Sequence, residues 1–273
     1  MIDKNYKRKI FNRSAKSYDE FSILQNDVSD NLFDRLVDLK LNPKLILDLG
    51  CGTGRNGKIL KNIYKDAKIV NYDFSENMLT QARMKQISFF DKILQNKRSS
   101  FICGDIENLV FTNKIFDIVW STNSLQWCNN LSVTFKSIGS ILKPNGLFIF
   151  TTFGPKTLYE LRNITRKISS FQKTNDFIDM DNIKKILINK GFSNPILESE
   201  EVCLTYSNIK KLFLELKSIG ATSGLKIKKN GLTGKSFLKK IEEGYENYKH
   251  KEKFTATYEV IYGYARYKKN NKT

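Results

Sequence analysis

The feature that most constrains the fold is the stretch LILDLGCGTG at residues 45–54. Four apolar residues surround Asp48, and glycines follow at the alternate positions Gly50, Gly52 and Gly54. This pattern is typical of a buried parallel strand that ends in a tight turn, with a helix beginning after the last glycine. Glycine tolerates positive φ and, without a Cβ, lets a ligand approach the backbone. We therefore expect an open α/β sheet with a ligand above this turn, where free N–H groups point.

The order of residues in the turn narrows the class of ligand. A dinucleotide-binding fold prefers G-x-G-x-x-G after its first strand, whereas this chain has D-x-G-x-G-x-G. That order resembles motif I of the class I S-adenosylmethionine-dependent methyltransferases. The resemblance implies that Asp48 and the backbone of Gly50, Gly52 and Gly54 hold the methionine part of S-adenosylmethionine. A glycine-rich turn that only packs a strand on a helix is the alternative.

A second acid stands at the end of the next predicted strand, residues 68–73. The carboxylate of Asp73 lies at its carboxyl end, where it can accept hydrogen bonds from both ribose hydroxyls of an adenosyl group. Ser75 is suited to cap the following helix, which brings Met78 close to the adenine position. An aspartate that only caps a helix or a turn is the alternative for Asp73.

A third acid follows the short predicted strand at residues 100–103. In the methyltransferase pattern, an acid at the place of Asp105 takes the adenine amino group, and the backbone of the next residue, Ile106, serves a ring nitrogen. After a fourth predicted strand at 116–120, Ser121 begins the loop over the methyl donor. Three acids at successive strand ends, together with the glycine turn, are hard to assign to chance.

Strand and helix patterns alternate from residue 45 to residue 153, as a doubly wound parallel sheet requires. We predict an α/β protein with a Rossmann-like class I methyltransferase fold and a seven-stranded, mostly parallel sheet. Further predicted elements are strands at 147–153, 194–206 and 254–267 and helices at 131–142, 179–189, 208–218 and 233–245.

We expect a single domain, residues 1–273. Two or three helices in residues 1–41 would cover the cofactor-binding core at 42–153, as many class I methyltransferases have such helices over the cleft. Tyr18 and Gln25 could line that cleft. A helical, substrate-side insertion at 154–250 would come before the last strand and the tail at 251–273.

The composition excludes several kinds of chemistry. The chain has one histidine, His250, in a lysine-rich stretch, and its four cysteines form no C-x-x-C pair. A metal site or a histidine-based catalytic triad is therefore not expected. No apolar run approaches the roughly 20 residues that cross a bilayer, and the first residues lack the apolar stretch of a secretory signal. We expect a cytoplasmic protein without a membrane partner.

The net charge of +18, from 46 Lys and Arg against 28 Asp and Glu, favours an anionic partner. A genome biased toward Lys, Asn and Ile is the alternative source of this charge. The chain has no RGG segment and no RNA-recognition signature, so we do not expect a nucleic-acid partner.

Five segments narrow the family. They are FNRSAKSYDEFSILQ at the start, NSLQWCNNL after the fourth strand, TTFGPKTLYELR after the fifth, LKSIGAT at 216–222, and TYEVIYGYAR near the end. Together they resemble the malonyl-[acyl-carrier protein] O-methyltransferases of biotin synthesis, and the resemblance covers almost the whole chain. Its implied reaction moves a methyl group from S-adenosylmethionine to the free carboxylate of a malonyl thioester on acyl carrier protein, an acidic partner. We expect the enzyme to be a monomer.

That reaction suits the residues available. A carboxylate with a pKa of about 4 is ionised at pH 7 and needs no general base. The protein has mainly to align oxygen, methyl and sulfur within about 3–3.5 Å. Tyr18 and Trp127 are candidates for the walls of that site. Arg162 and Lys217 are candidate partners for the malonyl carboxylate or for the phosphate of the carrier's arm, with solvated helix faces as the alternative.

Two other functions stay open on the sequence alone. One is a class I methyltransferase for another small acid or for tRNA. The other is a catalytically silent assembly factor of the same fold, against which the intact glycine turn, Asp73 and Asp105 argue.

Overall fold

The N-terminal segment is helical, as predicted. The computed structural model describes residues 3–36, 39–87, 98–168, 177–221 and 234–268. Helix α1 (Lys4–Ser14) is followed by the single turn α2 (Tyr18–Phe21) and by α3 (Ile23–Asp34). Asp3 caps α1 by accepting a hydrogen bond from the N–H of Tyr6 at 3.0 Å.

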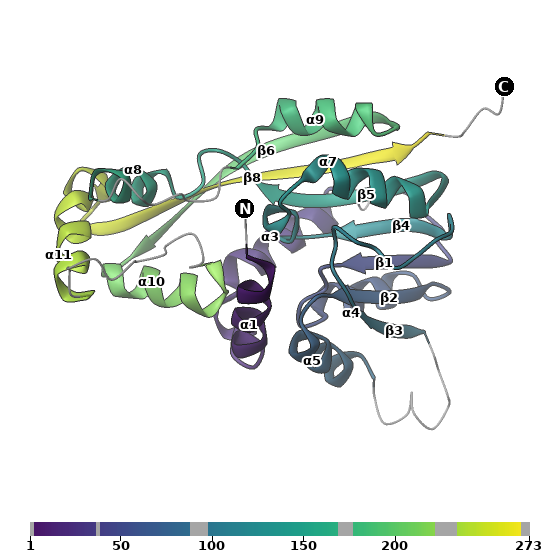
Figure 1. Cartoon of the computed structure of the whole chain (residues 1–273), viewed down its shortest axis with the longest axis horizontal. Coiled ribbons are helices and arrows are strands. Elements are labelled where there is room, and N and C mark those ends of the chain that lie inside the picture. The colour runs from purple at the N-terminus through teal and green to yellow at the C-terminus, as the bar shows by residue number, and fades with distance from the viewer. Residues whose placement is uncertain (1–2, 37–38, 88–97, 169–176, 222–233, 269–273) are drawn as a thin grey trace.

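One mixed sheet forms the centre of the molecule (Figure 1). Five strands are mutually parallel: β1 (Leu45–Leu49), β2 (Lys68–Asp73), β3 (Ser99–Cys103), β4 (Phe116–Ser121) and β5 (Leu142–Phe153). The sheet continues in antiparallel fashion with β8 (Lys253–Tyr267) and β6 (Phe192–Tyr206), in the order β3-β2-β1-β4-β5-β8-β6. The described residues give eight strands where seven were predicted, because the short β7 (Lys249–His250) pairs with the start of β8.

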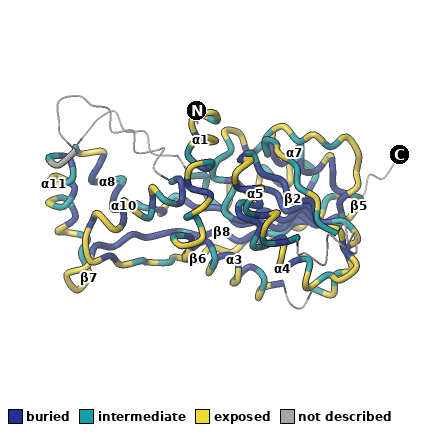
Figure 2. The backbone as a smooth tube through the Cα atoms, turned by 90° about the horizontal axis from the view of Figure 1, so that it is seen from below, coloured by how far each residue is buried: buried dark blue, intermediate teal, exposed yellow. Residues whose placement is uncertain are grey.

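Helices cover both faces of this sheet. Ile46 and Leu47 are neighbours in β1, but they pack in different cores. Ile46 joins α3 and α4 (Arg55–Ile63), whereas Leu47 joins α7 (Leu131–Ile141) and α9 (Met180–Asn189). Because successive side chains of a strand point to opposite faces, the apolar run of β1 supplies both cores. Figure 2 shows the central strands as buried and the outer sides of the helices as largely exposed.

The long strands β6 and β8 extend past the rest of the sheet and hold a second group of helices. Helices α8 (Tyr159–Ile168), α10 (Ile209–Ser218) and α11 (Gly234–Tyr245) gather at that end, the side toward which β1 and β5 point (Figure 1). Their buried residues Leu161, Leu212 and Ile241 belong to the same apolar cluster as the residues of α3. The region predicted as an insertion therefore has two parts, because α9 instead covers the sheet beside α7.

Two strands begin two or more residues before the predicted start, and β3, β4 and β8 differ from their predicted bounds by one residue at one end. Strand β5 begins at Leu142, which pairs with Phe116 before the chain bulges and re-enters the ladder with Leu147 opposite Ile118. Within the bulge Asn145 has a φ of 63°, so the Pro-Asn-Gly sequence makes an irregularity inside a strand. Strand β6 begins at 192 instead of 194. The predictions for residues 222, 233 and 269–273 lie outside the described residues.

Candidate active site

A cavity opens above the carboxyl ends of β1, β2 and β4, where the sequence predicted a ligand. It encloses about 1070 Å³, part of it open to solvent, and so is large enough for a small-molecule ligand. We call it the first cavity. Its wall contains most of the residues predicted to hold the cofactor or to border the reaction, namely Tyr18, Gln25, Gly50, Gly52, Asp73, Met78, Asp105, Ile106 and Trp127.

The glycine turn forms the floor of the first cavity. Gly50, Gly52 and Gly54 have φ values of 76°, 53° and 82°, a region that side chains disfavour. A Cβ on Gly50 would come 2.4 Å from the Cβ of Ser124, and one on Gly54 would come 2.5 Å from that of Ala82. At Gly52 no heavy atom lies within 4 Å of the added Cβ. The outer glycines are thus needed for packing within the protein, and the middle one leaves space for a ligand.

Asp73 ends β2 with its carboxylate turned toward this glycine turn. Its Oδ2 accepts the N–H of Gly52 at 2.9 Å and its Oδ1 accepts the N–H of Ser75 at 2.8 Å. Burial raises the pKa of Asp73 to about 6, although the backbone N–H groups lower it. Each carboxylate oxygen can accept a further hydrogen bond, so Asp73 can still receive ribose hydroxyls. Ser75 caps α5 (Glu76–Gln86) through the N–H of Met78, as predicted.

Asp48 lies directly beneath the turn and is only 1% exposed. Burial raises its pKa to about 7; the backbone N–H of Gly57 opposes this shift and the charge of Asp73 adds to it. Its Oδ2 is buried without a hydrogen-bond partner among the described residues. An unpartnered buried acceptor is costly, and a cationic ligand nearby would favour the ionised form of this carboxyl group.

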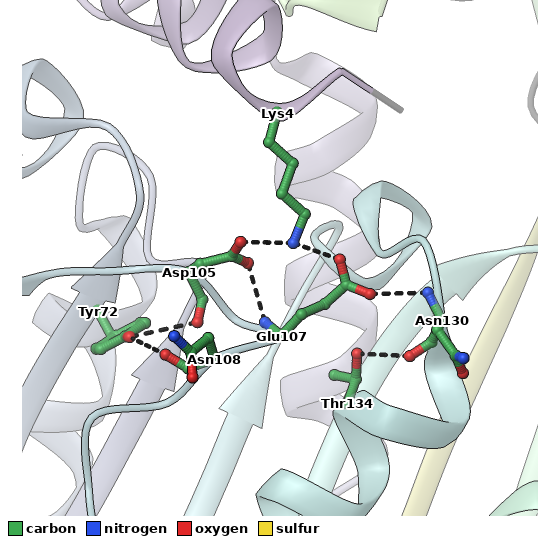
Figure 3. Close-up of polar contacts among 7 residues, drawn as sticks. All are labelled: Lys4, Tyr72, Asp105, Glu107, Asn108, Asn130 and Thr134. Carbon is green, nitrogen blue, oxygen red and sulfur yellow. Dashed lines mark hydrogen bonds and ion pairs between the residues drawn. The ribbon is translucent and has the colours of Figure 1, made fainter. Parts of the chain in front are cut away.

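Asp105 lies in a polar cluster that also holds α1 in place (Figure 3). The ammonium of Lys4 lies between the carboxylates of Asp105, at 2.5 Å, and Glu107. Burial disfavours the charge of Lys4, but the two carboxylates outweigh it and raise its pKa. Glu107 also accepts the N–H of Asn130, the N-cap of α7, at 2.8 Å. The cluster therefore joins the predicted adenine end of the cavity to α1 through Lys4 and to the start of α7 through Asn130.

Three residues predicted to hold the cofactor lie behind the described wall of the first cavity: Asp48, Gly54 and Ser121. The hydroxyl of Ser121 donates to the carbonyl of Leu49 at 3.0 Å and lies 2.6 Å from the hydroxyl of Ser124. Ser124, one turn further along the loop, lines the cavity instead. The sequence predicted Ser121, at the end of β4, as the polar residue that faces the cofactor, but its hydroxyl is buried in bonds within the protein.

A second cavity, of about 820 Å³ with its open part, adjoins the first. The two share Tyr18, Gln25, Asn123 and Trp127, the last of which ends the short 3₁₀ helix η1 (Leu125–Trp127). The rest of the described wall is mostly apolar. Most of it comes from the end of β5, from α8 and the segment before it, and from α10 and the segment after it, and it includes Phe153, Leu158, Leu161, Leu216 and Ile219. The second cavity is therefore suited to an extended, largely uncharged group.

Of the two predicted substrate contacts, only Arg162 lies in this wall. Its Nη1 donates to the carbonyls of Pro155 at 2.5 Å and Thr157 at 3.2 Å, and its guanidinium lies 5.8 Å from the ring centroid of Phe177. It is the one charged residue among the described residues that line the second cavity. Lys217 is exposed on α10, outside the described walls of both cavities.

Sequence reasoning missed Lys7. This residue of α1 lines the first cavity but is only 1% exposed, and its Nζ donates to the carbonyl of Gly220 at 2.8 Å. Burial lowers the pKa of Lys7 to about 7. Nothing in the basic segment that contains it distinguishes a buried lysine from its solvated neighbours. Only the packing of α1 against distant parts of the chain reveals it.

Comparison with known proteins identifies the family. Residues 47–150 match the family model of the methyltransferase domain. A malonyl-[acyl-carrier protein] O-methyltransferase of Methylovorus sp. (strain MP688) is 38% identical over 265 residues, which covers 97% of this chain and 89% of that protein. The chain belongs to the malonyl-[acyl-carrier protein] O-methyltransferase family. A biotin biosynthesis bifunctional protein of Teredinibacter turnerae is 32% identical, with 94% of this chain and 45% of that protein covered.

Solved structures share the fold of this malonyl-carrier methyltransferase family member. Phosphoethanolamine N-methyltransferase 2 of Haemonchus contortus, in complex with S-adenosyl-L-methionine, superposes with a TM-score of 0.59 at 15% identity. The match covers 94% of this chain and 57% of that one. The predicted Rossmann-like class I fold is confirmed. Across the described residues, no helix has the length and apolar character needed to span a membrane, and no cluster of His, Cys, Asp and Glu is suited to a metal.

The five segments that resemble the malonyl-carrier methyltransferases meet at the second cavity. Tyr18 and Gln25 come from the first segment, Trp127 from the second, Arg162 from the third and Leu216 from the fourth. The fifth contributes Tyr258. Apart from Phe177, every described residue of this wall belongs to one of the five segments. The first cavity, by contrast, has the glycine turn and strand-end acids common to class I methyltransferases in general.

Proposed function

We propose that this protein transfers the methyl group of S-adenosylmethionine to the free carboxylate of a malonyl thioester on acyl carrier protein, a step of biotin synthesis. The observation that carries the proposal is the composition of the second cavity. Its wall is built almost entirely from the segments by which the chain resembles its family, and it adjoins the first cavity at Tyr18 and Trp127, which line both. A methyl donor in one cavity and an acceptor in the other would meet at that junction.

The first cavity would hold the cofactor. Asp73 would accept the ribose hydroxyls, and Asp105 with the backbone of Ile106 would receive the adenine ring near Met78. Gly50, Gly52, Gly54, Asp48 and Ser121 would act at the methionine end, of which only Gly50 and Gly52 reach the cavity wall. When bound, S-adenosylmethionine supplies a sulfonium methyl group. The open space over Gly52 supports this assignment, and the buried carboxyl group of Asp48 behind the wall favours a cationic ligand.

The second cavity would hold the malonyl thioester and the end of the carrier's arm. Arg162, fixed by two backbone carbonyls, would attract the carboxylate into an otherwise uncharged wall. Tyr18 and Trp127 would confine the acceptor oxygen in line with the methyl and sulfur. The bond from oxygen to the methyl carbon forms as the carbon–sulfur bond breaks, and the carboxylate and sulfonium charges cancel. No proton has to be removed, so no general base is needed.

We further propose that the enzyme is a single-domain cytoplasmic monomer that does not bind nucleic acid. Lys217, exposed on α10 whose other side lines the second cavity, would then meet the phosphate of the arm or the acidic carrier, in place of the malonyl carboxylate. A dimer in analytical ultracentrifugation, or tight tRNA binding at physiological salt, would contradict these assignments.

The deciding experiment compares acceptors that differ only in the free carboxylate. Purified protein is incubated with isotope-labelled S-adenosylmethionine and either malonyl- or acetyl-acyl carrier protein, and the products are read by mass spectrometry. We expect one methyl group on the malonyl carrier and none on the acetyl carrier, because acetyl offers no carboxylate. Malonyl-coenzyme A in a third sample tests whether the carrier protein is required. Equal labelling of the first two samples, or none of either, would refute the proposed acceptor.

A further inference from the structure

Lys7 joins three parts of the molecule that are far apart in the sequence. Its ammonium lies 3.3 Å from the centroid of a Trp127 ring and 2.8 Å from the carbonyl oxygen of Gly220. Phe11, one turn later on α1, lies edge-on to the same indole, with ring centroids 5.8 Å apart. A cation over the face of tryptophan is attracted by the ring, most strongly when it is shielded from water.

The partners of Lys7 border the junction of the two cavities. Trp127 lines both of them, and Ile219, next to Gly220, lines the second. Gly220 has a φ of 75°, and a Cβ there would come 3.1 Å from the ring of Phe11. Helix α1 is therefore packed closely on Gly220, which follows Ile219, the C-cap of α10. Lys7 ties these two helices to the indole between the cavities.

A buried lysine is an expensive way to hold a structure together. Among the described residues no carboxylate pairs with Lys7, so its charge is compensated by the Trp127 indole, one carbonyl and the ring of Phe11, whose centroid is 5.7 Å away. Well-packed apolar side chains of similar volume usually serve stability as well as or better than buried charges. Burial lowers the pKa of Lys7 to about 7, which expresses this cost. Because Lys7 lies at the junction of the two cavities, we look for its role in the reaction and not in stability.

We propose that Lys7 is a positioning residue for methyl transfer. It holds the Trp127 indole and the segment at Gly220, just after α10, in the arrangement that places the two cavities side by side. Lys7 acts through these groups and does not itself touch the reacting atoms. This inference rests on the proposed function for its kinetic consequences, but the contact with Trp127 can be tested without any turnover.

The kinetic test replaces Lys7 with methionine, which keeps most of the side-chain volume and removes the charge. The matched control is Lys9→Met, on the exposed side of the same helix. With malonyl-acyl carrier protein, we expect Lys7→Met to lower kcat at least about tenfold, the scale of loss for a misplaced positioning group. The dissociation constant of S-adenosylhomocysteine should stay within about twofold of the wild-type value, because Lys7 positions groups for the transfer step and does not hold the bound cofactor. Lys7→Arg should restore part of kcat by returning the cation to the indole face.

The second test reads the indole directly. The chain has two tryptophans, and Trp120 is buried and stacked on Phe33, so Trp120→Phe leaves Trp127 as the one fluorophore of its kind. In that background, Lys7→Met should change the emission of Trp127 and make it more accessible to acrylamide, whereas Lys9→Met should not. The melting temperature of Lys7→Met should not fall, because the substitution removes a buried charge.

The outcomes separate the two proposals. A wild-type enzyme that leaves malonyl carrier unmethylated refutes the proposed function, while the fluorescence comparison still tests the position of Lys7. Unchanged kcat in Lys7→Met refutes the positioning role. So does a lower melting temperature with unchanged Trp127 quenching, because Lys7 would then only support the fold.

Discussion

Replacing Asp73 with asparagine tests the cofactor assignment most directly. The change keeps the volume of the side chain but turns one acceptor oxygen into an amide donor. That oxygen faces an N–H group in either orientation, because Gly52 and Ser75 each donate to one oxygen of Asp73. Asparagine must therefore lose at least one of these hydrogen bonds, together with the charge expected to receive the ribose hydroxyls.

The size of the effect follows from the proposed contact with the ribose. A hydrogen bond from a ribose hydroxyl to a charged carboxylate contributes about 1.5–3 kcal/mol, so losing one should raise the dissociation constant of the cofactor about 10- to 150-fold. Isothermal calorimetry with S-adenosylhomocysteine measures it without turnover. Asp66→Asn is the matched control, because Asp66 is exposed and its one ion pair with a described residue is to Lys44 on the surface. An affinity of Asp73→Asn within twofold of the wild type would refute the ribose assignment.

The pH dependence gives the same prediction a second test. Burial raises the pKa of Asp73 to about 6, so the carboxylate is mostly ionised at pH 8 and mostly protonated at pH 5. If the ionised form binds the cofactor, affinity should fall about tenfold as pH drops through this range, in proportion to the competent fraction. Asp48, with a pKa of about 7, contributes a second titration. Asp73→Asn should remove only the lower of the two, and an unchanged profile would contradict the assignment.

Two further substitutions test the remaining parts of the site. Asp48→Asn should stabilise the ligand-free protein at pH 8 by about 2–4 kcal/mol, measured by urea unfolding. The pKa of Asp48 is raised from 3.8 to about 7 in the folded protein, so the wild type is most stable below pH 3.8 and loses stability as pH rises through 7. Asparagine has no such loss because it does not ionise. The gain should shrink toward pH 5, and a gain that instead grows there would contradict the burial argument. Arg162→Lys keeps the charge but not the planar fork, so kcat/KM for malonyl-acyl carrier protein should fall about 10- to 150-fold. Lys184→Ala, on the exposed side of α9 and outside the described walls of both cavities, is the control, and an equal loss in both variants would remove Arg162 from the carboxylate site.

Much of the fold could be predicted because its signals are local. The glycine turn needs positive φ at three positions, and only glycine reaches that region readily. Helix starts were likewise visible, since Ser75, Asp179 and Asn208 each accept a backbone N–H as N-caps. The ends of β2 and β3 placed Asp73 and Asp105 on one edge of the sheet, because the carboxyl ends of parallel strands meet there.

The parts that could not be predicted depend on contacts between distant segments. Lys4 and Lys7 belong to one basic run, yet Lys4 forms ion pairs across the first cavity and Lys7 is buried against Gly220. Periodicity cannot separate these roles, because each is decided by what the fold brings opposite α1. The bulge before Leu147 was missed for a related reason. Pro144 and Gly146 indicate that the strand begins after them, but Leu142 already pairs with Phe116 of the neighbouring strand.

The charges around the two cavities suggest why this arrangement suits a reaction between a cation and an anion. Asp48 and Asp73 are buried together, and the charge of Asp73 adds to the raised pKa of Asp48. A cationic ligand would reverse both penalties, whereas an anionic one would add to them. Lys4, a cation in the wall at the adenine end, is already paired with two carboxylates. Across the junction, the wall around Arg162 favours the opposite sign. Because the two reacting charges cancel as the methyl moves, water-poor surroundings favour the transition state over the separated ions.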